Sequence, residues 1–433
     1  MAHIEPFRAL RYDPAQVVLR QVATQPYDKI TPQMQEGYYL ASPYNLVRII
    51  LGKRHSTDNP GDNCYTRAAA FFKEWRRQGV LRQDPEPSIY RYVQRFAAPS
   101  GGAVLERQGF IALGKIEDYS AGVVFRHEQT LAKPKADRLD LLRSTGAHFG
   151  QIFMLYSDPR MEIENALATG EPPPIEVEDE YGVLHQVWPV EDAEIIQHVR
   201  AKMQDKKLVI ADGHHRYETA LNYRNERRAA DPGGNKDITA YEFVMMTFVN
   251  MDSPGLVVLP THRVVHGLSA FSMDKFRTAA SDFFSVEEGD GSLDARRATI
   301  MLREAAHTGP ALLAISQNRA FLMSRAKAPA EVFRGLSFRQ QSLDVVQLHK
   351  CLLERALGIS EEAICNQQNL SYIRDAAEAI ATVREGKADL AFLMNPAKVA
   401  QVRDIAFAGE VMPQKTTDFY PKLLSGLTIY ALE

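Results

Sequence analysis

The sequence has few cysteines, no long apolar run and no surplus of charge of one sign. Its three cysteines, Cys64, Cys351 and Cys365, lie far apart and form no C-x-x-C pair, which excludes a disulfide framework and indicates a reducing compartment. No stretch approaches the roughly 18 consecutive apolar residues of a membrane-spanning helix. The N-terminus carries charges where a signal peptide needs an apolar run. We therefore expect a cytosolic protein that does not enter membranes.

The balance of charges argues against a general nucleic-acid binder. The 51 Lys and Arg residues face 54 Asp and Glu, which gives a net charge of −3, whereas such binders usually carry a basic surplus. The 433 residues suggest two to four domains at about 100–200 residues each. A hydrophobic fraction of 45% is that of an ordinary globular protein with a conventional core.

Hydrophobic periodicity predicts both helices and strands along the chain. The expected fold class is α/β, mixed with α+β regions. After Gly267 the pattern indicates a separate α+β lobe, and the acidic Gly170–Tyr181 indicates an exposed loop or a sheet edge. The expected helices of the first part are Tyr65–Gln78, Ala136–Ala147, Glu191–Met203 and His214–Arg228. The expected strands or β-rich runs are Ile4–Tyr12, Asn45–Leu51, Ser88–Phe96, Gln108–Ile116, Gln151–Tyr156, Lys207–Ala211 and Tyr241–Asn250.

The motif IADGHHRYE, residues 210–218, lies where an expected strand passes into an expected helix. A helix begins with about four backbone N–H groups that lack intrahelical partners and with about half a positive charge from its dipole. The glycine lets the backbone approach a ligand, and the first turn then presents two imidazoles and a guanidinium. Because all these groups favour an anion, the motif predicts a phosphate or nucleotide site. Its residues are Asp212, Gly213, His214, His215 and Arg216.

Two other interpretations of the motif stay open. In a purely structural one, Asp212 caps the helix and Arg216 pairs with Asp205 or a surface carboxylate. In the other, Asp212 and Glu218 hold a metal ion, with His214 on the same helical face as Glu218. The metal signal is weaker than H-E-x-x-H because no second histidine follows at the required spacing.

The strand–D-G-H-H-R–helix arrangement resembles the phosphate-binding motif of the ParB/sulfiredoxin superfamily, and most of all that of ParB-like free-serine kinases. Gly213 and Arg216 match the G-E-R-R of ParB proteins. Gly213, His215 and Arg216 match the G-G-C-H-R of sulfiredoxins. His214 replaces the reactive cysteine of sulfiredoxins, which excludes reduction of a sulfinic acid.

Across nearly its whole length the sequence also resembles the bacterial and archaeal family DUF1015, a domain of unknown function. Together the resemblances imply an N-terminal domain, 1–267, with a ParB-like core (about 1–40 and 188–267) and an inserted α+β region (about 41–187). They imply a separate C-terminal α+β domain over 268–433. The matching segments are PFRALRY, QPYDKI, SPYN, HEQT, IADGHHRYETAL, LPTHR and MPQKTTDFYPK.

Several residues outside the motif are further candidates. ParB-like serine kinases place an acidic residue early in the chain as general base or metal partner, and by region this corresponds to Asp28, which otherwise forms a turn. His127 and Glu128 are expected as a surface pair. The other candidates are possible ligands of the substrate, with structural roles as the alternative: His262, Arg263, Lys415 and Thr416.

The leading functional hypothesis is a nucleotide-dependent phosphotransferase that acts on a small hydroxyl compound, and by resemblance a free-serine kinase. ATP or ADP and Mg²⁺ are the expected cofactors, and Asp28, His214 or His215 would accept the hydroxyl proton. The first alternative is a nucleotide-gated ParB-like switch, and the second is a metal-dependent hydrolase. The oligomeric state stays open, with a homodimer as one candidate.

Overall fold

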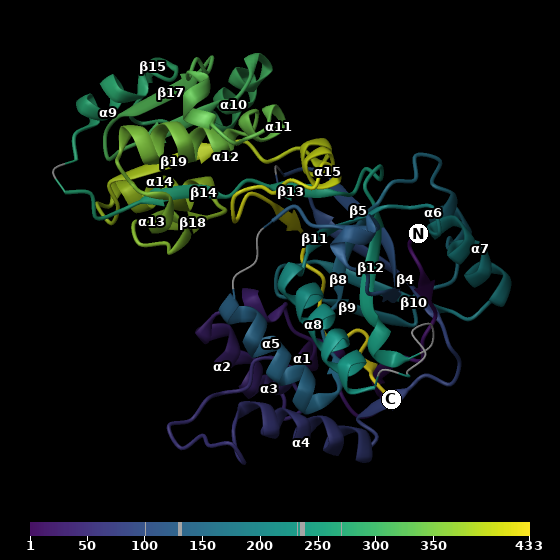
Figure 1. Ribbon diagram of the computed structural model, residues 1–433. Coiled ribbons are helices and arrows are strands. Elements are labelled where there is room, and N and C mark those ends of the chain that lie inside the picture. The colour runs from purple at the N-terminus through teal and green to yellow at the C-terminus, as the bar shows by residue number, and fades with distance from the viewer. Residues whose placement is uncertain (100, 129–131, 232, 234–238, 270) are drawn as a thin grey trace. The chain divides into compact units, whose positions relative to one another are not determined.

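The chain forms two compact units in the computed structural model, which describes residues 1–99, 101–128, 132–231, 233, 239–269 and 271–433 (Figure 1). The first unit comprises residues 1–126, 130–256 and 421–433, and the second comprises 127–129 and 257–420. These units differ from the predicted division at 267/268 in three ways. The main segment of the second unit begins at 257, residues 127–129 also belong to that unit, and the last 13 residues belong to the first unit. The mixed α/β class is confirmed.

A large mixed sheet organises the first unit. Within the described residues it has nine strands in the order β6-β11-β8-β12-β5-β4-β10-β9, with β1 paired to β5. The β6–β11 and β8–β12 pairs are parallel and the other pairs are antiparallel. The strands are β1 Ile4–Glu5, β4 Ile89–Ala97, β5 Val104–Lys115, β6 Val124–Phe125, β8 Ile152–Tyr156, β9 Ile175–Glu178, β10 Leu184–Val190, β11 Leu208–Asp212 and β12 Phe243–Asn250.

The region predicted as an insertion, about 41–187, supplies much of this sheet. Its strands β5 and β8 flank β12, all eight residues of which are buried. Such a strand is apolar throughout because both of its faces are covered. The predicted sheet edge at Gly170–Tyr181 is confirmed, since β9 is the last strand in the order.

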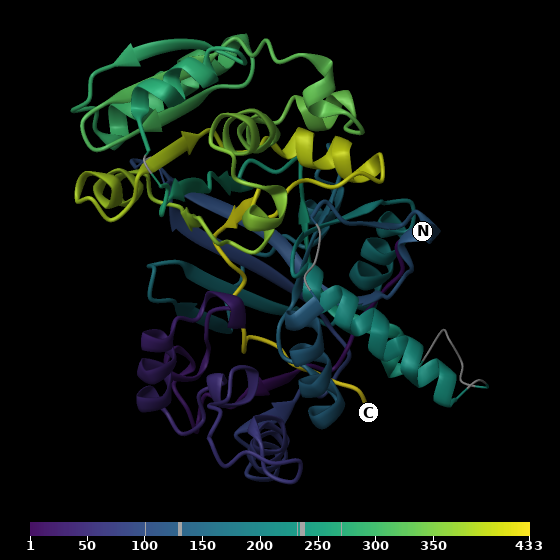
Figure 2. The ribbon, with the colours of Figure 1, turned by 60° about the vertical axis from the view of Figure 1, so that its left-hand side comes forward.

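Helices pack on the sheet, and a second apolar cluster in this unit includes Val22, Leu46 and Trp75. Tyr217 and Ala220 of α8 share one core with Val199 and Met203 of α7, and α5 packs along α8 (Figure 2). No helix in the described part of the chain is long and apolar enough to cross a membrane. The helices of this unit are α1 Leu19–Val22, α2 Pro32–Ala41, α3 Val47–Ile50, α4 Cys64–Arg77, α5 Ala132–Thr145, α6 Glu162–Ala166, α7 Ala193–Met203 and α8 His214–Ala230, with a 3₁₀ turn η1 at Tyr27–Lys29.

Helix α4 was predicted and α3 was not. Asn63 caps α4 in a capping box with Thr66, and the helix buries Phe72 and Trp75. The β-rich run Asn45–Leu51 instead contains helix α3. The buried Asn45 side chain accepts a hydrogen bond from the Val47 amide at 2.9 Å, and the apolar residues of α3 are buried. Local capping and tertiary burial therefore override β-propensity there.

The predicted strand Ile4–Tyr12 is two short strands, because Pro6 between them cannot donate to a ladder. Strand β2, Leu10–Tyr12, pairs with β3, Leu81–Gln83.

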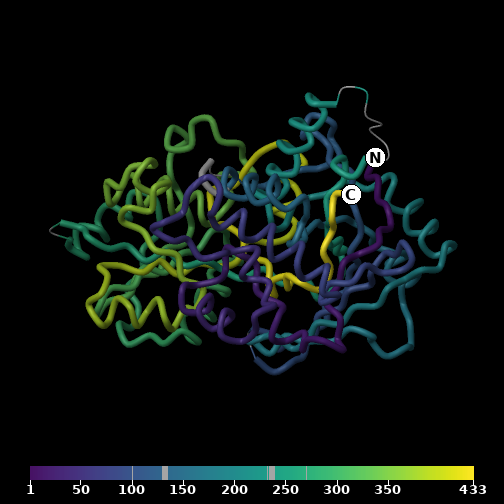
Figure 3. The backbone as a smooth tube through the Cα atoms, turned by 90° about the horizontal axis from the view of Figure 1, so that it is seen from below, coloured from purple at the N-terminus to yellow at the C-terminus, as the bar shows by residue number. Residues whose placement is uncertain are grey.

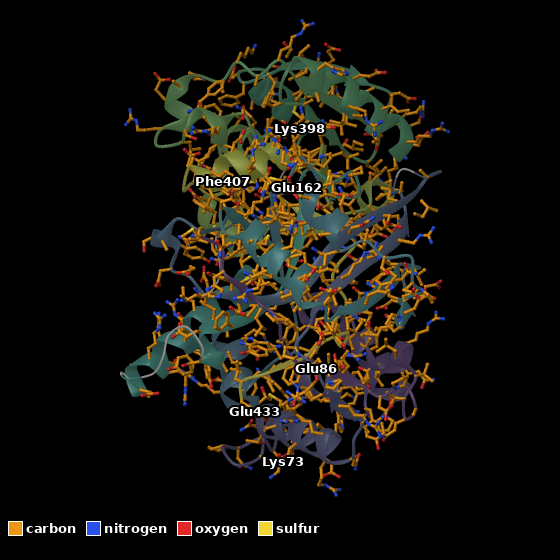
Figure 4. The ribbon with its side chains drawn as sticks, turned by 90° about the vertical axis from the view of Figure 1, so that its right-hand side faces the viewer. Lys73, Glu86, Glu162, Lys398, Phe407 and Glu433 are labelled. Carbon is orange, nitrogen blue, oxygen red and sulfur yellow. The ribbon has the colours of Figure 1, made fainter. Side chains whose placement is uncertain are left out.

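The C-terminal stretch threads back through the first unit. Ser425 bridges Thr24 and Ile429 bridges Leu10, so the yellow end of the tube in Figure 3 runs beside the purple N-terminal segment. Strand β21, Tyr430–Ala431, pairs with β7, Ala147–His148. Glu433 pairs with Arg76 of α4, close to the labelled Lys73 of that helix (Figure 4).

The second unit is built on an antiparallel sheet of the described strands β15-β17-β16-β19-β14-β18. Helices α10 and α14 bury Leu302 and Ile380 against Leu313 of β16 and Leu393 of β19 (Figure 1). Strand β13, Val257–Leu259, pairs separately with β20, Asp418–Tyr420. The sheet strands are β14 His262–Val265, β15 Ser285–Gly289, β16 Leu312–Ile315, β17 Ala320–Ser324, β18 Leu370–Ile373 and β19 Leu390–Met394. The helices are α9 Met273–Ala280, α10 Ala295–Ala305, α11 Phe338–Gln341, α12 Asp344–Gln347, the π-helix η6 Leu348–Ala356, α13 Glu361–Cys365, α14 Ala376–Arg384 and α15 Val399–Phe407.

Candidate functional site

The predicted strand–glycine–helix junction is present. Strand β11 ends at Asp212, and α8 begins at His214 after Gly213, whose φ is 90°. Other residues rarely adopt that φ, and a Cβ on Gly213 would lie 3.1 Å from the guanidinium of Arg216. The backbone conformation therefore favours glycine here, and any side chain would also have to displace the Arg216 guanidinium by a few tenths of an ångström.

Two cations converge on the carboxylate that precedes the glycine. Lys422 Nζ lies 2.8 Å from Asp212 Oδ2, and a guanidinium nitrogen of Arg216 lies 3.6 Å from Oδ1. Burial acts to raise the pKa of Asp212, but the charges of Lys422 and Arg216 outweigh burial and lower it well below its usual range. Lys29 lowers this pKa further. Asp212 is thus ionised and is held between positive charges.

This arrangement differs from the purely structural interpretation. Gly213 is the N-cap of α8, and within the described residues the helix has no hydrogen bond from a capping side chain. Arg216 donates to the backbone carbonyl of Gln151 and pairs with Asp212. Asp212 therefore serves as the partner of Lys422 and Arg216 and not as a helix cap.

Lys422 is the site residue that the sequence did not single out. It ends the segment Met412–Lys422, for which Lys415 was the predicted ligand. The Lys422 carbonyl accepts a 2.9 Å hydrogen bond from Gln94, and the neighbouring Pro421 carbonyl accepts one from Arg107 at 2.5 Å. Arg107 is fully buried, and burial lowers its pKa to about 10. These contacts fix the backbone that carries Lys422.

A cavity of about 60 Å³ lies beside the motif, lined among others by Arg216, Tyr27, Arg138 and Gly150. It has room for a few water molecules or an oxyanion. The Arg138 guanidinium lies 4.1 Å from the centre of the Tyr27 ring. Asp28, the predicted general base, is exposed on the same turn as Tyr27. The structure thus brings the early Pro-Tyr-Asp segment to the same cavity as Arg216.

The remaining motif residues lie on the first two turns of α8. His214 is buried and His215 is partly exposed. Glu218 is 8% exposed, and its carboxylate lies 2.8 Å from Lys135 Nζ and 3.5 Å from Arg126.

The predicted metal ligands, Asp212 and Glu218, stay a prediction, and the structure shows each of them in an ion pair. Asp212 and Glu218 each already face a lysine at 2.8 Å. Among the described residues, no group of three or more His, Cys, Asp or Glu side chains is placed to hold a metal ion. The motif environment is instead cationic, which suits an anionic ligand.

The four residues predicted to bind substrate all belong to the second unit, where His262 and Arg263 have structural contacts. His262 accepts a 3.3 Å hydrogen bond from the Met394 amide, and burial, with Arg263, lowers the pKa of His262 to about 4. The fully buried Arg263 donates to the carbonyls of Gln414 and Lys415 at 3.3 and 3.1 Å. Both contacts favour the structural alternative.

The other two predicted substrate ligands, Lys415 and Thr416, lie in the segment Met412–Lys422. The predicted surface pair, His127 and Glu128, lies beside this segment. Lys415 is exposed with φ 56°, and the Thr416 hydroxyl donates to the Pro413 carbonyl. Their role in substrate binding stays a prediction. His127 was expected at the surface but is fully buried, with Nε2 2.8 Å from the Thr417 hydroxyl. The surface-pair interpretation was wrong because this tertiary contact encloses the imidazole.

Three solved structures show a distant similarity to this chain. A conserved hypothetical protein from Pyrococcus furiosus is 13% identical, with a TM-score of 0.34 over 68% of this chain and 86% of that chain. A free serine kinase in complex with AMP is 14% identical, with a TM-score of 0.34 over 68% and 83%. SbnI with a C-terminal truncation, from Staphylococcus aureus, is 9% identical, with a TM-score of 0.35 over 75% and 89%. TM-scores at this level carry no argument about activity.

The sequence comparisons identify the family. No curated protein matches the sequence. Residues 4–346 match the family described as "Protein of unknown function (DUF1015)", which includes the motif and most of both units. The match confirms the resemblance drawn from the sequence segments, and the chain belongs to the DUF1015 family.

Proposed function

We propose that the protein is a nucleotide-dependent phosphotransferase that transfers a phosphoryl group from ATP or ADP to a small hydroxyl compound. The observation that carries the proposal is the convergence of Arg216 and Lys422 on Asp212 at the glycine that opens α8. Phosphoryl transfer depends mainly on positioning and on neutralising the charge of the transferred group. A helix start with two converging cations supplies both.

The first turn of α8 would hold the phosphates, with Gly213, His215 and Arg216 facing them. Lys422 pairs with Asp212 at 2.8 Å and would share its charge with an incoming phosphate. Mg²⁺ would arrive on the nucleotide, because Mg²⁺ commonly uses substrate phosphates and only one or two carboxylates. Asp212 is the carboxylate of the motif that would contact it.

The acceptor hydroxyl would lie near the turn that carries Asp28. That turn adjoins the cavity through Tyr27, and Asp28 is exposed and free to reach a substrate hydroxyl. Asp28 would take the hydroxyl proton, with His214 or His215 as the alternatives. The finer form of the proposal, a free-serine kinase, rests on the resemblance of the D-G-H-H-R motif to that of ParB-like serine kinases.

The test is phosphoryl transfer by the full chain. Purified protein is incubated with Mg²⁺, ATP or ADP, and separately serine, homoserine, threonine and glycerol, and products are identified by ³¹P NMR and mass spectrometry. We expect one acceptor to be phosphorylated. His215→Ala should lower kcat/KM by about 100-fold or more, in the range of a lost acid–base or phosphate-binding group.

The matched control is His198→Ala, which changes an exposed histidine of α7 in the same unit and should leave kcat/KM unchanged. Absence of transfer to every acceptor, or equal activity of the His215 variant, would contradict the proposal. Nucleotide binding without transfer would instead favour a nucleotide-gated switch.

A further inference from the structure

The second unit contains a cavity of about 200 Å³ that the phosphotransferase hypothesis does not use. Its wall includes the buried apolar side chains of Leu343 and Met394 and the charged residues Asp344 and Lys398. An apolar cavity of about 150 Å³ in another protein holds one benzene molecule, so this cavity has room for a ligand of about eight non-hydrogen atoms.

Asp344 brings a carboxylate to this cavity without a partner of opposite charge. It is the first residue of α12, and no basic side chain of a described residue lies within 4.0 Å of it. Its hydrogen-bond donors are neutral, namely the Asn395 side chain and the backbone amides of Asn395 and Ala311. Burial outweighs these donors and raises the pKa of Asp344 to about 7. Because a buried carboxylate is normally paired, a cationic group of a ligand would supply what is missing.

Lys398 brings an unpaired positive charge to the same cavity. It is exposed, it is labelled in Figure 4, and it is the N-cap of α15. No carboxylate of a described residue lies within 4.0 Å of its ammonium group. Both its charge and the positive end of the α15 dipole favour an anionic group of a ligand here.

The two charges together select the ligand. The positive charge of Lys398 lowers the pKa of Asp344, so the two side chains are near each other, yet they do not form an ion pair. A ligand with one positive charge would suit Asp344 but would be repelled by Lys398, and a ligand with one negative charge would meet the opposite difficulty. A short molecule that carries both charges satisfies both side chains.

We propose that this cavity binds a small amino acid as a zwitterion, with the ammonium group on Asp344 and the carboxylate on Lys398. The side chain of the amino acid lies against Leu343 and Met394. Small-molecule sites are built in this way, from an apolar lining with a few placed polar groups. The site belongs to the second unit, whereas Gly213 belongs to the first, and it does not depend on the phosphotransferase hypothesis.

Valine is the probe, because it matches the size of the cavity and has no hydroxyl group that a phosphotransferase could use. Isobutylamine is valine without the carboxylate, and 3-methylbutanoate is valine without the ammonium group. Binding to the full chain is measured at pH 8, where Asp344 is mostly ionised, by isothermal titration calorimetry and saturation-transfer NMR. We expect valine to bind at least tenfold more tightly than either analogue, because each analogue lacks one charged contact.

Two charge variants assign the ends of the ligand. Asp344→Asn should weaken valine at least tenfold and should also weaken isobutylamine, but it should not weaken 3-methylbutanoate. Lys398→Met should weaken valine and 3-methylbutanoate about threefold or more, a smaller effect because Lys398 is exposed, and should not weaken isobutylamine. The matched controls, Asp282→Asn and Lys275→Met, change exposed residues of the same unit and should leave all three affinities unchanged.

A third variant tests the cavity itself without changing a charge. Ala397 lines the cavity and is partly exposed, so Ala397→Trp should fill the cavity and abolish valine binding while the far-ultraviolet circular dichroism is unchanged. Absence of valine binding at millimolar concentration would overturn the proposal. So would an analogue that binds as tightly as valine, or valine binding that Asp344→Asn or Ala397→Trp leaves intact.

Discussion

Lys422→Met tests whether the C-terminal lysine stabilises the motif through Asp212. The Lys422 and Asp212 side chains are 10% and 22% exposed. Removal of one partner of a buried ion pair typically costs about 3–5 kcal/mol, because the other charge is left uncompensated. Asp212 keeps some contact with solvent and retains Arg216 at 3.6 Å. We therefore expect a loss of about 2–3 kcal/mol in the free energy of unfolding at pH 7.

The loss of unfolding free energy in Lys422→Met should depend on pH, because the pair contributes only while Asp212 is ionised. In the folded protein the pKa of Asp212 lies below its unfolded value of about 3.9. The pair therefore contributes stability that is complete above about pH 4 and is lost as the pH falls toward the folded pKa. The difference between the wild type and Lys422→Met should be constant from pH 6 to 8 and should shrink below about pH 4.

Urea unfolding followed by tryptophan fluorescence measures this difference. Both tryptophans, Trp75 and Trp188, belong to the first unit and report its unfolding. With an m value of about 3 kcal/mol/M, the midpoint should fall by about 0.7–1 M urea. The control is Lys202→Met, which removes a more exposed pair with Glu162 and should leave the midpoint nearly unchanged. Equal midpoints at pH 7, or the same difference at pH 3 as at pH 7, would refute the reasoning.

Two further predictions concern the glycine of the motif and a buried carboxyl of the second unit. Gly213→Ala should destabilise the first unit by about 1–2 kcal/mol, because φ is 90° and the new Cβ meets Arg216, whereas Gly37→Ala, in open space on α2, should not destabilise it. Urea unfolding midpoints test both variants. An unchanged midpoint for Gly213→Ala would contradict the expected backbone strain at residue 213. Asp344 is mostly buried, and burial, opposed by a hydrogen bond from Asn395, raises its pKa to about 7. Stability of the second unit should therefore fall as the pH rises from about 4 to 7, and Asp344→Asn should recover about 2–4 kcal/mol at pH 8, measured by hydrogen exchange. An unchanged exchange rate in this variant at pH 8 would contradict the raised pKa.

Local patterns in the sequence predicted the elements that local interactions determine. Helix α4 follows from apolar spacing with the Asn63 cap, and the β11–α8 junction follows from a buried run that ends in Asp212 and Gly213. The prediction for Asn45–Leu51 was wrong because the buried Asn45 and the packing of α3 outweigh β-propensity. The pairing order of the sheet was not predicted, since it joins strands far apart in the chain.

The sequence by itself determined that residues 212–216 form a glycine-opened helix start suited to an anion, because neighbours in the chain make that geometry. Only the tertiary structure decided which distant side chain pairs with Asp212 at this helix start. Lys422 lies 210 residues beyond Asp212, and Arg107 and Gln94 fix its backbone. Tertiary structure also gave His262 and Arg263 their structural contacts. Burial and long-range contacts set the role of a charged side chain, and neither can be read from spacing along the chain.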